Sequence, residues 1–289
     1  MKKTIYGLLL LSLAGVVSCE KESATQDTEA TTKVDEKANT KNYAIAVETL
    51  NEQLFRKQYD MNTSVFSSGT TLNNYLFYGI GAYNYDMAVL EKTGTNSSTI
   101  YYESGIPGNN KYGPVKLDGA DFLLDEIELI DDNIDKLFGL RGGRIYWLIY
   151  NGSNFDASLY YTYPGTPINI ATRRFTIAPV ANSNSFIRLY SASNVASQVG
   201  QPPAMTTLNY VDMNVDNGLI TPFTSVSTQI PGTGNLSSFT AVDYFNTPPI
   251  AAKHYVVVDK DIYNLNTATT LSLTGSFANS VRDCSFYHR

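Results

Sequence analysis

Two stretches of the chain match one another without a gap, and this match constrains the fold more than any other feature. The first copy is Lys136–Leu140 followed by Ile145–Leu148, and the second is Lys253–Val257 followed by Ile262–Leu265. A lysine, an Ile-Tyr pair and a leucine are identical at a constant offset of 117 residues. Glycine or aspartate residues suited to turns separate the two halves of each copy. Each copy therefore predicts a β-hairpin.

The spacing of these hairpins predicts a repeated architecture. A third Ile-Tyr pair, Ile100-Tyr101, precedes Ile145 by 45 residues. The offset of 117 residues between the two matching hairpins is close to three units of about 39 residues, a length typical of four-stranded propeller blades. Hairpins stacked around an axis share a core and leave few free edges. We therefore predict an all-β chain of five to seven degenerate β-propeller-like repeats of about 39–45 residues. A β-sandwich is the alternative, because two amphipathic hairpins can look alike by chance.

Other apolar, aromatic-rich runs between turn residues predict further strands. Residues Asn42–Tyr59 fit both the alternation of a strand and the spacing of one helical face. We expect a strand first and then a turn or short helix. The remaining expected strands are Tyr75–Ala82, Met87–Leu90, Thr99–Tyr102, Phe122–Ile130, Ser158–Tyr163, Phe175–Ile177, Phe186–Tyr190, Leu208–Met213 and Phe239–Tyr244, besides the two hairpins.

Composition is consistent with one secreted-type β domain over residues 42–289. Aromatic residues make up 12% of the 289 residues, and 21 of them are tyrosines. Such residues fill pleated surfaces, while the abundant Asn, Gly and Ser form turns. The net charge of -6 offers nothing to a phosphate backbone, so we expect no nucleic-acid partner.

The first 18 residues predict a cleaved secretory signal. Lys2 and Lys3 precede an apolar segment, Ile5–Val17, which is too short to span a bilayer and ends in Ser18 and Cys19. The segment resembles the type II signals of bacterial lipoproteins, in which the cysteine becomes the lipidated first residue. This resemblance implies lipidation of Cys19 and an anchor in the outer membrane, on its periplasmic or outer face. Residues 19–41 are polar, and we expect a disordered tether.

The start of the β domain carries a second resemblance. Asn42–Asn51 and the aromatic run Tyr75–Tyr85 look like the beginning of envelope lipoproteins that have a β-propeller domain. Some members of that group are associated with outer-membrane uptake receptors and with capture of a ligand or iron chelate. The resemblance thus implies an outer-membrane receptor or an extracellular ligand as partner. It carries no ligand-binding signature to a position in this chain.

Residues suited to catalysis are few. The only histidines are His254 and His288, so a three-histidine zinc site is impossible. Once Cys19 is lipidated, Cys284 is the one remaining cysteine, and we expect it as a half-buried thiol in or beside a last strand. No nucleotide-binding loop or nucleophile elbow is present. We therefore expect no cofactor and no enzyme.

Carboxylates form three patterns worth testing. The sequences Asp131-Asn133-Asp135 and Asp212-Asn214-Asp216 have the alternating spacing that opens a calcium loop. Both lack a correctly placed glycine and the late glutamate, so alternation on an exposed hairpin is favoured and we predict no metal. The run Asp118–Asp135 predicts a solvated face, although Asp125, Glu126 and Glu128 leave a carboxylate-pair glycosidase open.

Aromatic side chains are the best candidates for ligand binding. Apolar rings on a polar background suit sugars and planar ligands. The candidates are Trp147, Phe155, Tyr160, Tyr161 and Tyr163. Ordinary strand packing is the competing interpretation of the same residues.

Three functions follow from these features. We expect a binding module for a glycan, peptide or metal chelate. A structural or adhesive surface protein is the second hypothesis, with the loops Gly105–Tyr112 and Gln198–Met205 as its contacts. A hydrolase acting on extracellular polysaccharide is the third.

Overall fold

A computed structural model describes fourteen segments of the chain. They are residues 42–48, 54–60, 65–66, 70–73, 77–83, 86–104, 108–131, 134–164, 173–180, 183–195, 205–231, 239–244, 253–267 and 270–288. The chain divides into two units, Met1–Ala38 and Asn39–Arg289, and all described segments belong to the second. The predicted signal, Cys19 and the tether lie outside the described residues.

The described residues form β-strands, turns and one short 3₁₀ helix, η2 (Ile134–Lys136). The first two groups of strands are β1 (Asn42–Glu48), β2 (Leu54–Asp60), β3 (Val65–Phe66), β4 (Thr70–Asn73), and then β5 (Phe77–Tyr83), β6 (Asp86–Lys92), β7 (Ser98–Glu103), β8 (Lys111–Leu117) and β9 (Ala120–Asp121). The third and fourth are β10 (Glu126–Leu129), β11 (Leu137–Arg141), β12 (Arg144–Tyr150), β13 (Phe155–Thr162), and then β14 (Arg173–Pro179), β15 (Phe186–Val195), β16 (Met205–Asn214) and β17 (Thr224–Pro231). The last comprises β18 (Phe239–Tyr244), β19 (Lys253–Val258), β20 (Asp261–Thr267), β21 (Thr270–Ser276) and β22 (Val281–His288).

Neighbouring strands pair in antiparallel meanders. The described strands give β5-β6-β7-β8, β10-β11-β12-β13, β14-β15-β16-β17 and β18-β19-β20-β21, while β22 pairs with β1 and β1 with β2 to complete a fifth unit. The units of β5–β8 and β10–β13 are joined where the outer strands β8 and β13 pair in parallel over two residues, so together with β9 they form one nine-stranded sheet.

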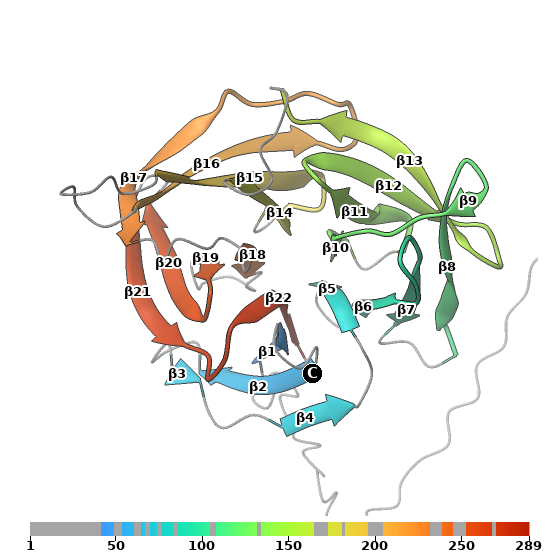
Figure 1. Cartoon of the computed structure of the whole chain (residues 1–289), viewed down its shortest axis with the longest axis horizontal. Coiled ribbons are helices and arrows are strands. Elements are labelled where there is room, and N and C mark those ends of the chain that lie inside the picture. The colour runs from blue at the N-terminus through green and yellow to red at the C-terminus, as the bar shows by residue number, and fades with distance from the viewer. Residues whose placement is uncertain are drawn as a thin grey trace, which may run out of the picture. The chain divides into compact units, whose positions relative to one another are not determined.

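The innermost strands of the five units contact one another in a closed circle. β22 lies against β5, β5 against β10, β10 against β14, β14 against β18, and β18 against β22. Figure 1 shows these strands surrounding a common centre, with the other strands of each unit stepping outward. A closed circle of antiparallel four-stranded sheets is a β-propeller, and within the described residues it has five blades. The predicted fold class is confirmed, and the sandwich alternative is wrong.

The C-terminal strand closes the circle. β22 pairs with β1 from Asn42↔His288 to Val47↔Asp283, and so becomes the innermost strand of the blade that the N-terminal strands begin. The predicted last strand therefore exists, and Cys284 lies within it as a free and buried thiol, more deeply enclosed than we expected.

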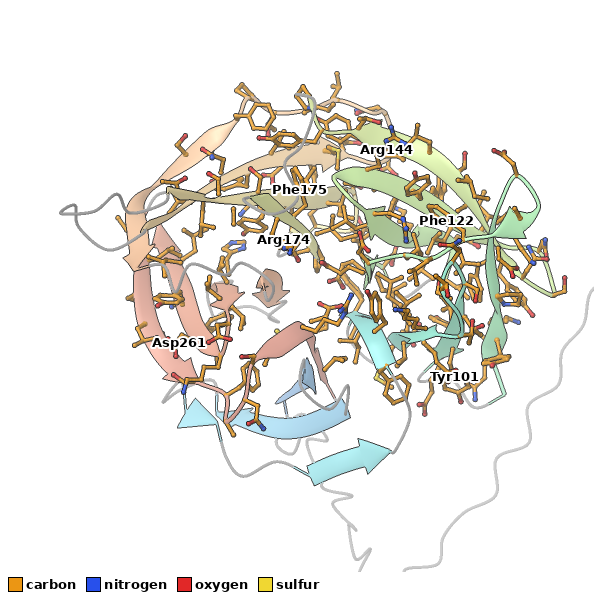
Figure 2. The ribbon with its side chains drawn as sticks, in the orientation of Figure 1. Tyr101, Phe122, Arg144, Arg174, Phe175 and Asp261 are labelled. Atoms are coloured by element: carbon orange, nitrogen blue, oxygen red, sulfur yellow. The ribbon has the colours of Figure 1, made fainter. Side chains whose placement is uncertain are left out.

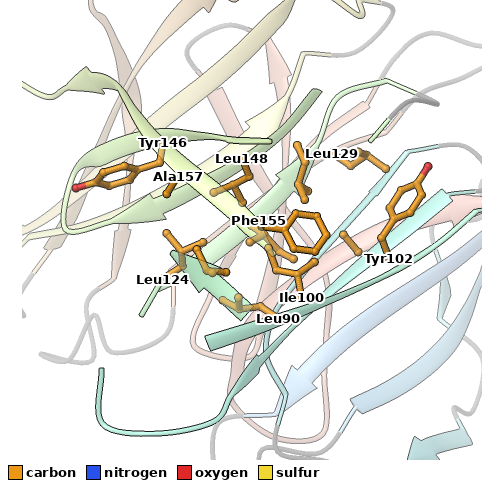
Figure 3. Close-up of a cluster of buried hydrophobic side chains, with 13 residues drawn as sticks. Leu90, Ile100, Tyr102, Leu124, Leu129, Tyr146, Leu148, Phe155 and Ala157 are labelled. Atoms are coloured by element: carbon orange, nitrogen blue, oxygen red, sulfur yellow. The ribbon is translucent and has the colours of Figure 1, made fainter. Parts of the chain in front are cut away.

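Apolar side chains fill the seams between successive blades. A cluster that includes Leu90, Ile100 and Phe155 joins the blades of β5–β8 and β10–β13 (Figure 3). A second cluster joins β10–β13 to β14–β17 through residues such as Phe138 and Ile187. One further cluster joins β14–β17 to β18–β21, and a smaller one joins β1 to β5 and β6. These neighbouring sheets thus meet at apolar faces, which explains the high content of aromatic and branched residues.

The repeated hairpins occupy equivalent positions in their blades. β11–β12 and β19–β20 are the second and third strands of their sheets, and Ile100 lies in β7, also a third strand. Ile100, Ile145 and Ile262 are all buried. The 45-residue offset is therefore one blade. The offset of 117 residues spans two blades rather than three, because only β14–β17 lies between the two hairpins. The predicted uniform repeat was wrong for the second half of the chain.

One predicted element differs in type. The turn or short helix expected before Tyr59 is the strand β2, which pairs with β1 on one side and with β4 on the other. Pairing on both edges outweighs the helical spacing of Leu50 and Leu54, because tertiary context decides short ambiguous runs.

Candidate functional site

Four of the five predicted aromatic residues lie in one seam, between the blades of β10–β13 and β14–β17. Trp147 lies on β12, Tyr160 and Tyr161 lie on β13, and Tyr163 follows directly. All four are partly buried and pack against the same apolar cluster. Phe175 of β14 packs there as well (Figure 2). Phe223, 47% exposed, extends the row from the segment before β17. We call these six residues the aromatic seam.

A β-bulge explains why consecutive tyrosines share this seam. β12 and β13 pair as Ile145↔Tyr161 but as Tyr146↔Leu159, so Tyr160 is an extra residue without a partner across the ladder. Successive side chains of a regular strand point to opposite faces. The bulge re-aims the strand, so that Tyr160 and Tyr161 both pack against one cluster.

Hydrogen bonds and ring contacts hold the seam in place. The indole Nε1 of Trp147 donates to the carbonyl of Asp135 (2.6 Å), and the hydroxyl of Tyr160 donates to the carbonyl of Asn214 (3.1 Å). Trp147 stacks on Phe138, with centroids 6.2 Å apart, and meets Tyr160 edge to face at 6.5 Å. The first bond connects β12 with η2, and the second connects β13 with the end of β16. Trp147 and Tyr160 are therefore rigid supports of the seam.

Tyr163 forms the centre of the more exposed half. Its ring meets Phe175 at 4.8 Å and Phe223 at 5.4 Å, both edge to face. Its hydroxyl lies 3.3 Å from that of Ser191. Phe223 follows Leu219 and Ile220, which are 69% and 46% exposed. Exposed rings and aliphatic side chains thus continue the seam to the surface.

Two tyrosine hydroxyls of the seam, those of Tyr160 and Tyr161, stay protonated at neutral pH. Burial, and then the charge of Asp216, raises the pKa of Tyr160. Burial, and then Tyr163, raises the pKa of Tyr161. Both hydroxyls therefore remain hydrogen-bond donors.

Phe155 does not belong to this seam. It begins β13, is fully buried and packs in the cluster on the other side of its blade, against Tyr150 at 5.0 Å (Figure 3). Its ring has no surface to offer a ligand, so the prediction of a binding role for Phe155 is wrong. Alternation along β13 before the bulge points it away from Tyr160.

Phe175 and Phe223 are the seam residues that the sequence did not indicate. Each comes from the blade of β14–β17, whereas the predicted residues come from the neighbouring blade. Only the packing of one blade on the next brings them together. Phe223 follows Pro222 in a polar segment and carries no periodic signal.

The two calcium-like motifs meet beside the seam. Lys136 donates to the carbonyl of Asn184 (2.6 Å) and contacts Asp216 (3.3 Å) and Asp131 (3.9 Å). A bond from Ser185, and then Lys136, lowers the pKa of Asp216. Lys136 stands where a calcium loop would need glycine. Its ammonium thus lies among the acidic side chains of both motifs. Asn133 lies outside the described residues.

Asp212 and Asn214 have partners that explain their spacing. Arg188 binds Asp212 through two parallel bonds, Nε to Oδ1 at 2.5 Å and Nη2 to Oδ2 at 2.8 Å. The side-chain oxygen of Asn214 accepts from the amides of Asp216 and Asn217 and caps the turn. Among the described residues, no group of three or more His, Cys, Asp or Glu side chains is arranged to hold a metal ion.

The carboxylates of the acidic run are not all on a solvated face. Asp125 caps the β11–β12 turn by accepting from the amide of Gly142 (2.9 Å). Glu126 and Glu128 are buried on the innermost strand β10, with 5% and 2% of their surface exposed. Burial, and then the nearby Asp283, raises the pKa of both well above the ordinary value. The predicted solvated face is therefore wrong for these two residues.

Of the two loops of the adhesive hypothesis, the structure describes residues 108–112 of the first and only the last residue of the second. Within the part of the first loop that is described, Tyr112 is 59% exposed and faces Tyr101 at 6.4 Å. Asn110 donates to the hydroxyl of Tyr101 (3.2 Å). Of the second loop, only Met205 is described.

Among the segments that the structure describes, no helix has the length and apolar character needed to cross a membrane.

Comparison with known proteins gives likenesses of structure alone. No family profile and no curated protein sequence matches the chain. An ancestral GH74 enzyme is 9% identical with a TM-score of 0.36; the match covers 85% of this chain, which spans 32% of that one. The β-propeller domain of Cps50 (Swd1) from Myceliophteria thermophila is 8% identical, with a TM-score of 0.37 and coverage of 79% and 84% of the two chains. The α-L-arabinanase of Penicillium chrysogenum is 11% identical, with a TM-score of 0.37 and coverage of 81% and 80%.

These neighbours correct one expectation. The sequence led us to expect no enzyme, yet the GH74 protein and the arabinanase are enzymes. The scarcity of histidine and cysteine was too narrow a reason for expecting no enzyme, because two paired carboxylates suffice to hydrolyse a glycoside. The chain is a β-propeller protein, and its fold also carries enzymes.

Proposed function

We propose that the chain is a lipid-anchored envelope protein whose β-propeller binds an extracellular ligand at the aromatic seam. Cys19 would carry the lipid, and residues 19–41 would tether the propeller to the outer membrane. The observation that supports binding is the continuity of the seam. Rings from two blades form one surface, supported from below by Trp147 and Tyr160 and open at Phe223.

The chemistry of the seam favours a glycan as the ligand. Sugar rings have apolar C–H faces that stack on aromatic rings and hydroxyl edges that need polar partners. Phe223 and Tyr163 supply the apolar part. Asp216 and Asn184, both exposed, lie with Lys136 at the Trp147–Tyr160 end of the seam and supply acceptors and donors there. A planar chelate would use the same rings but would not need this polar rim.

The anchor places this surface where such ligands occur. An outer-membrane lipoprotein meets glycans and chelates before they cross the envelope. A partner receptor in that membrane would receive the ligand from the propeller, as the resemblance to uptake-associated lipoproteins implies.

Binding is tested with the mature lipidated chain in detergent. The chain is screened against immobilised glycans and soluble iron chelates, and hits are measured by calorimetry. We expect Phe223→Ala to weaken a glycan hit by about ten- to a hundredfold, since stacking and hot-spot rings contribute about 1–3 kcal/mol. Tyr112→Ala, which removes another exposed ring, from the blade of β5–β8, is the matched control.

The outcomes separate the hypotheses. Equal loss in both variants, or undiminished binding in Phe223→Ala, would contradict a site at the seam. A folded chain that binds no glycan or chelate would favour the adhesive hypothesis. The anchor is tested separately: we expect Cys19→Ala to leave the membrane fraction and to lose incorporated radiolabelled palmitate, and persistent labelling would refute the lipidation assignment.

A further inference from the structure

Three carboxyl groups meet where the circle of innermost strands closes. Glu126 and Glu128 lie on β10 and Asp283 lies on β22, and none of the three is more than 5% exposed. β5 runs between these two strands, which both contact it. A Cβ added to Gly79 of β5 would lie 3.1 Å from Asp283 Oδ2 and 3.2 Å from Glu126 Cα. The carboxyl-bearing strands therefore enclose β5 from both sides.

Side chains of β22 and β10 bind the backbone of the next innermost strand. They do so along the inner edge of that strand, where no further strand pairs with it. Asp283 Oδ2 accepts from the amide of Ile80 (2.8 Å), and the hydroxyl of Ser285 accepts from the amide of Ala82 (3.0 Å). Glu126 Oε1 accepts from the hydroxyl of Thr176 (2.6 Å) and from the amide of Ile177 (2.8 Å). Side chains of one innermost strand thus satisfy the backbone of the next, as buried amides require.

The charges around this cluster are mostly acidic. The charge of Asp283 raises the pKa of both glutamates, and the charge of Asp125 raises that of Glu126. Burial is the main reason that the pKa of the Cys284 thiol is raised, and the charges of the two glutamates add to this effect. Several carboxylates in one buried site cannot all be ionised cheaply.

Two arginines belong to the packed strands. Arg282 of β22 directs its guanidinium to Tyr78 of β5, donating from Nε to the carbonyl (2.9 Å) and lying over the ring. Arg174 of β14 lies two residues before Thr176 and so on the same face (Figure 2). β1 adds the apolar Val47 at this end of β22.

We propose that Glu126, Glu128 and Asp283 form a proton-dependent latch, in which Asp283 fastens β22 to β5 and Glu126 fastens β10 to β14. The latch is closed while at least one carboxyl keeps its proton and loosens when all three are ionised. Because the pKa of both glutamates is raised in the fold, the latch is expected to loosen as pH rises. A group whose pKa is higher in the folded than in the unfolded chain stabilises the fold at any pH below its pKa in the unfolded chain. That stabilisation is lost as pH rises through its pKa in the folded chain.

Amide hydrogen exchange of the full chain tests the latch. After correction for the intrinsic pH dependence of exchange, we expect β22 to lose protection as pH rises above the ordinary range of carboxyl pKa values, with its opening equilibrium rising by up to tenfold per pH unit for each carboxyl that ionises. The outer strand β13 should change less. Glu128→Gln, which keeps the shape of the protonated acid, should flatten this dependence. Asp118→Asn is the control, because it is an exposed acid in a turn whose φ of 51° asparagine tolerates.

Infrared spectroscopy supplies a second readout that does not need a variant. We expect a protonated-carboxyl stretching band in the wild-type chain at neutral pH, reduced in Glu128→Gln and unchanged in Asp118→Asn. Absence of that band at neutral pH would overturn the proposal. So would protection of β22 that is independent of pH, or a loss of protection equal in β22 and β13.

Discussion

Replacing Gly81 by alanine tests the packing of the innermost strands most directly. A Cβ at this position of β5 would lie 2.6 Å from Glu128 Cα, 2.9 Å from Leu129 N and 3.0 Å from Glu128 C. Carbon atoms in contact lie about 3.5–4.0 Å apart, so β5 and β10 must separate by about 1 Å. All three atoms are backbone, and no side-chain rotation relieves the clash.

The expected cost follows from this geometry. Overpacking a dense interior costs about 1–3 kcal/mol, and a backbone clash belongs at the upper end of that range. Alanine returns about 0.4–1 kcal/mol by restricting the unfolded chain. A net loss of about 2 kcal/mol lowers Tm by about 4–8 °C in a domain of this size.

Calorimetry or circular dichroism of the full chain measures this change. Gly94→Ala is the matched control, since its added Cβ would meet only the side chain of Ser97, with the hydroxyl at 2.5 Å. A serine hydroxyl in an exposed turn can rotate away, so we expect a change within about 0.5 kcal/mol. A Tm of Gly81→Ala within about 1 °C of the control would refute the close approach of β5 and β10.

Three further changes probe other parts of the molecule. Phe155→Ala should destabilise the fold by about 3–5 kcal/mol in denaturant unfolding, because a fully buried ring leaves a cavity between two blades; ligand binding by the surviving folded fraction should be unaffected. Arg188→Met should cost about 3–5 kcal/mol in the same assay, since Asp212 then keeps a partly buried charge without its two parallel bonds, and an equal loss in Asp212→Asn would be expected. In an NMR titration, Ser185→Ala and Lys136→Ala should each raise the pKa of Asp216. Because the pKa of Asp216 is lowered in the fold, its contribution to stability is present above about pH 3.9 and disappears as pH falls through the folded value.

The sequence predicted the inner and middle strands better than the outer ones. β18 was expected at Phe239–Tyr244, where it lies, since strands between two seams must be apolar. β8, β17 and β21 were not expected. β8 contains Gly113 and Pro114, and β21 is intermediate or exposed along its whole length. An outer strand has one free edge and needs little apolar surface, so its pattern is weak.

The candidate site shows a similar division. Apolar rings on a polar background indicated Trp147, Tyr160, Tyr161 and Tyr163, which lie on or directly after adjacent strands of one hairpin. The register shift that adds Tyr160 to the same face is a tertiary property. Phe175 and Phe223 come from another blade, and no local pattern in a single chain identifies residues that meet only across a seam.

The pairing of β22 with β1 also bears on how the chain reaches its folded state. Asn42 and His288 are partners, so the first blade lacks its innermost strand until nearly all of the described chain is available. Closing so long a loop is slow because the entropy is lost before the contact is gained. Until then, the edge of β1 that β22 occupies in the fold is unpaired. Such an edge is the natural point at which a chaperone or a second unfolded copy competes with the chain's own last strand.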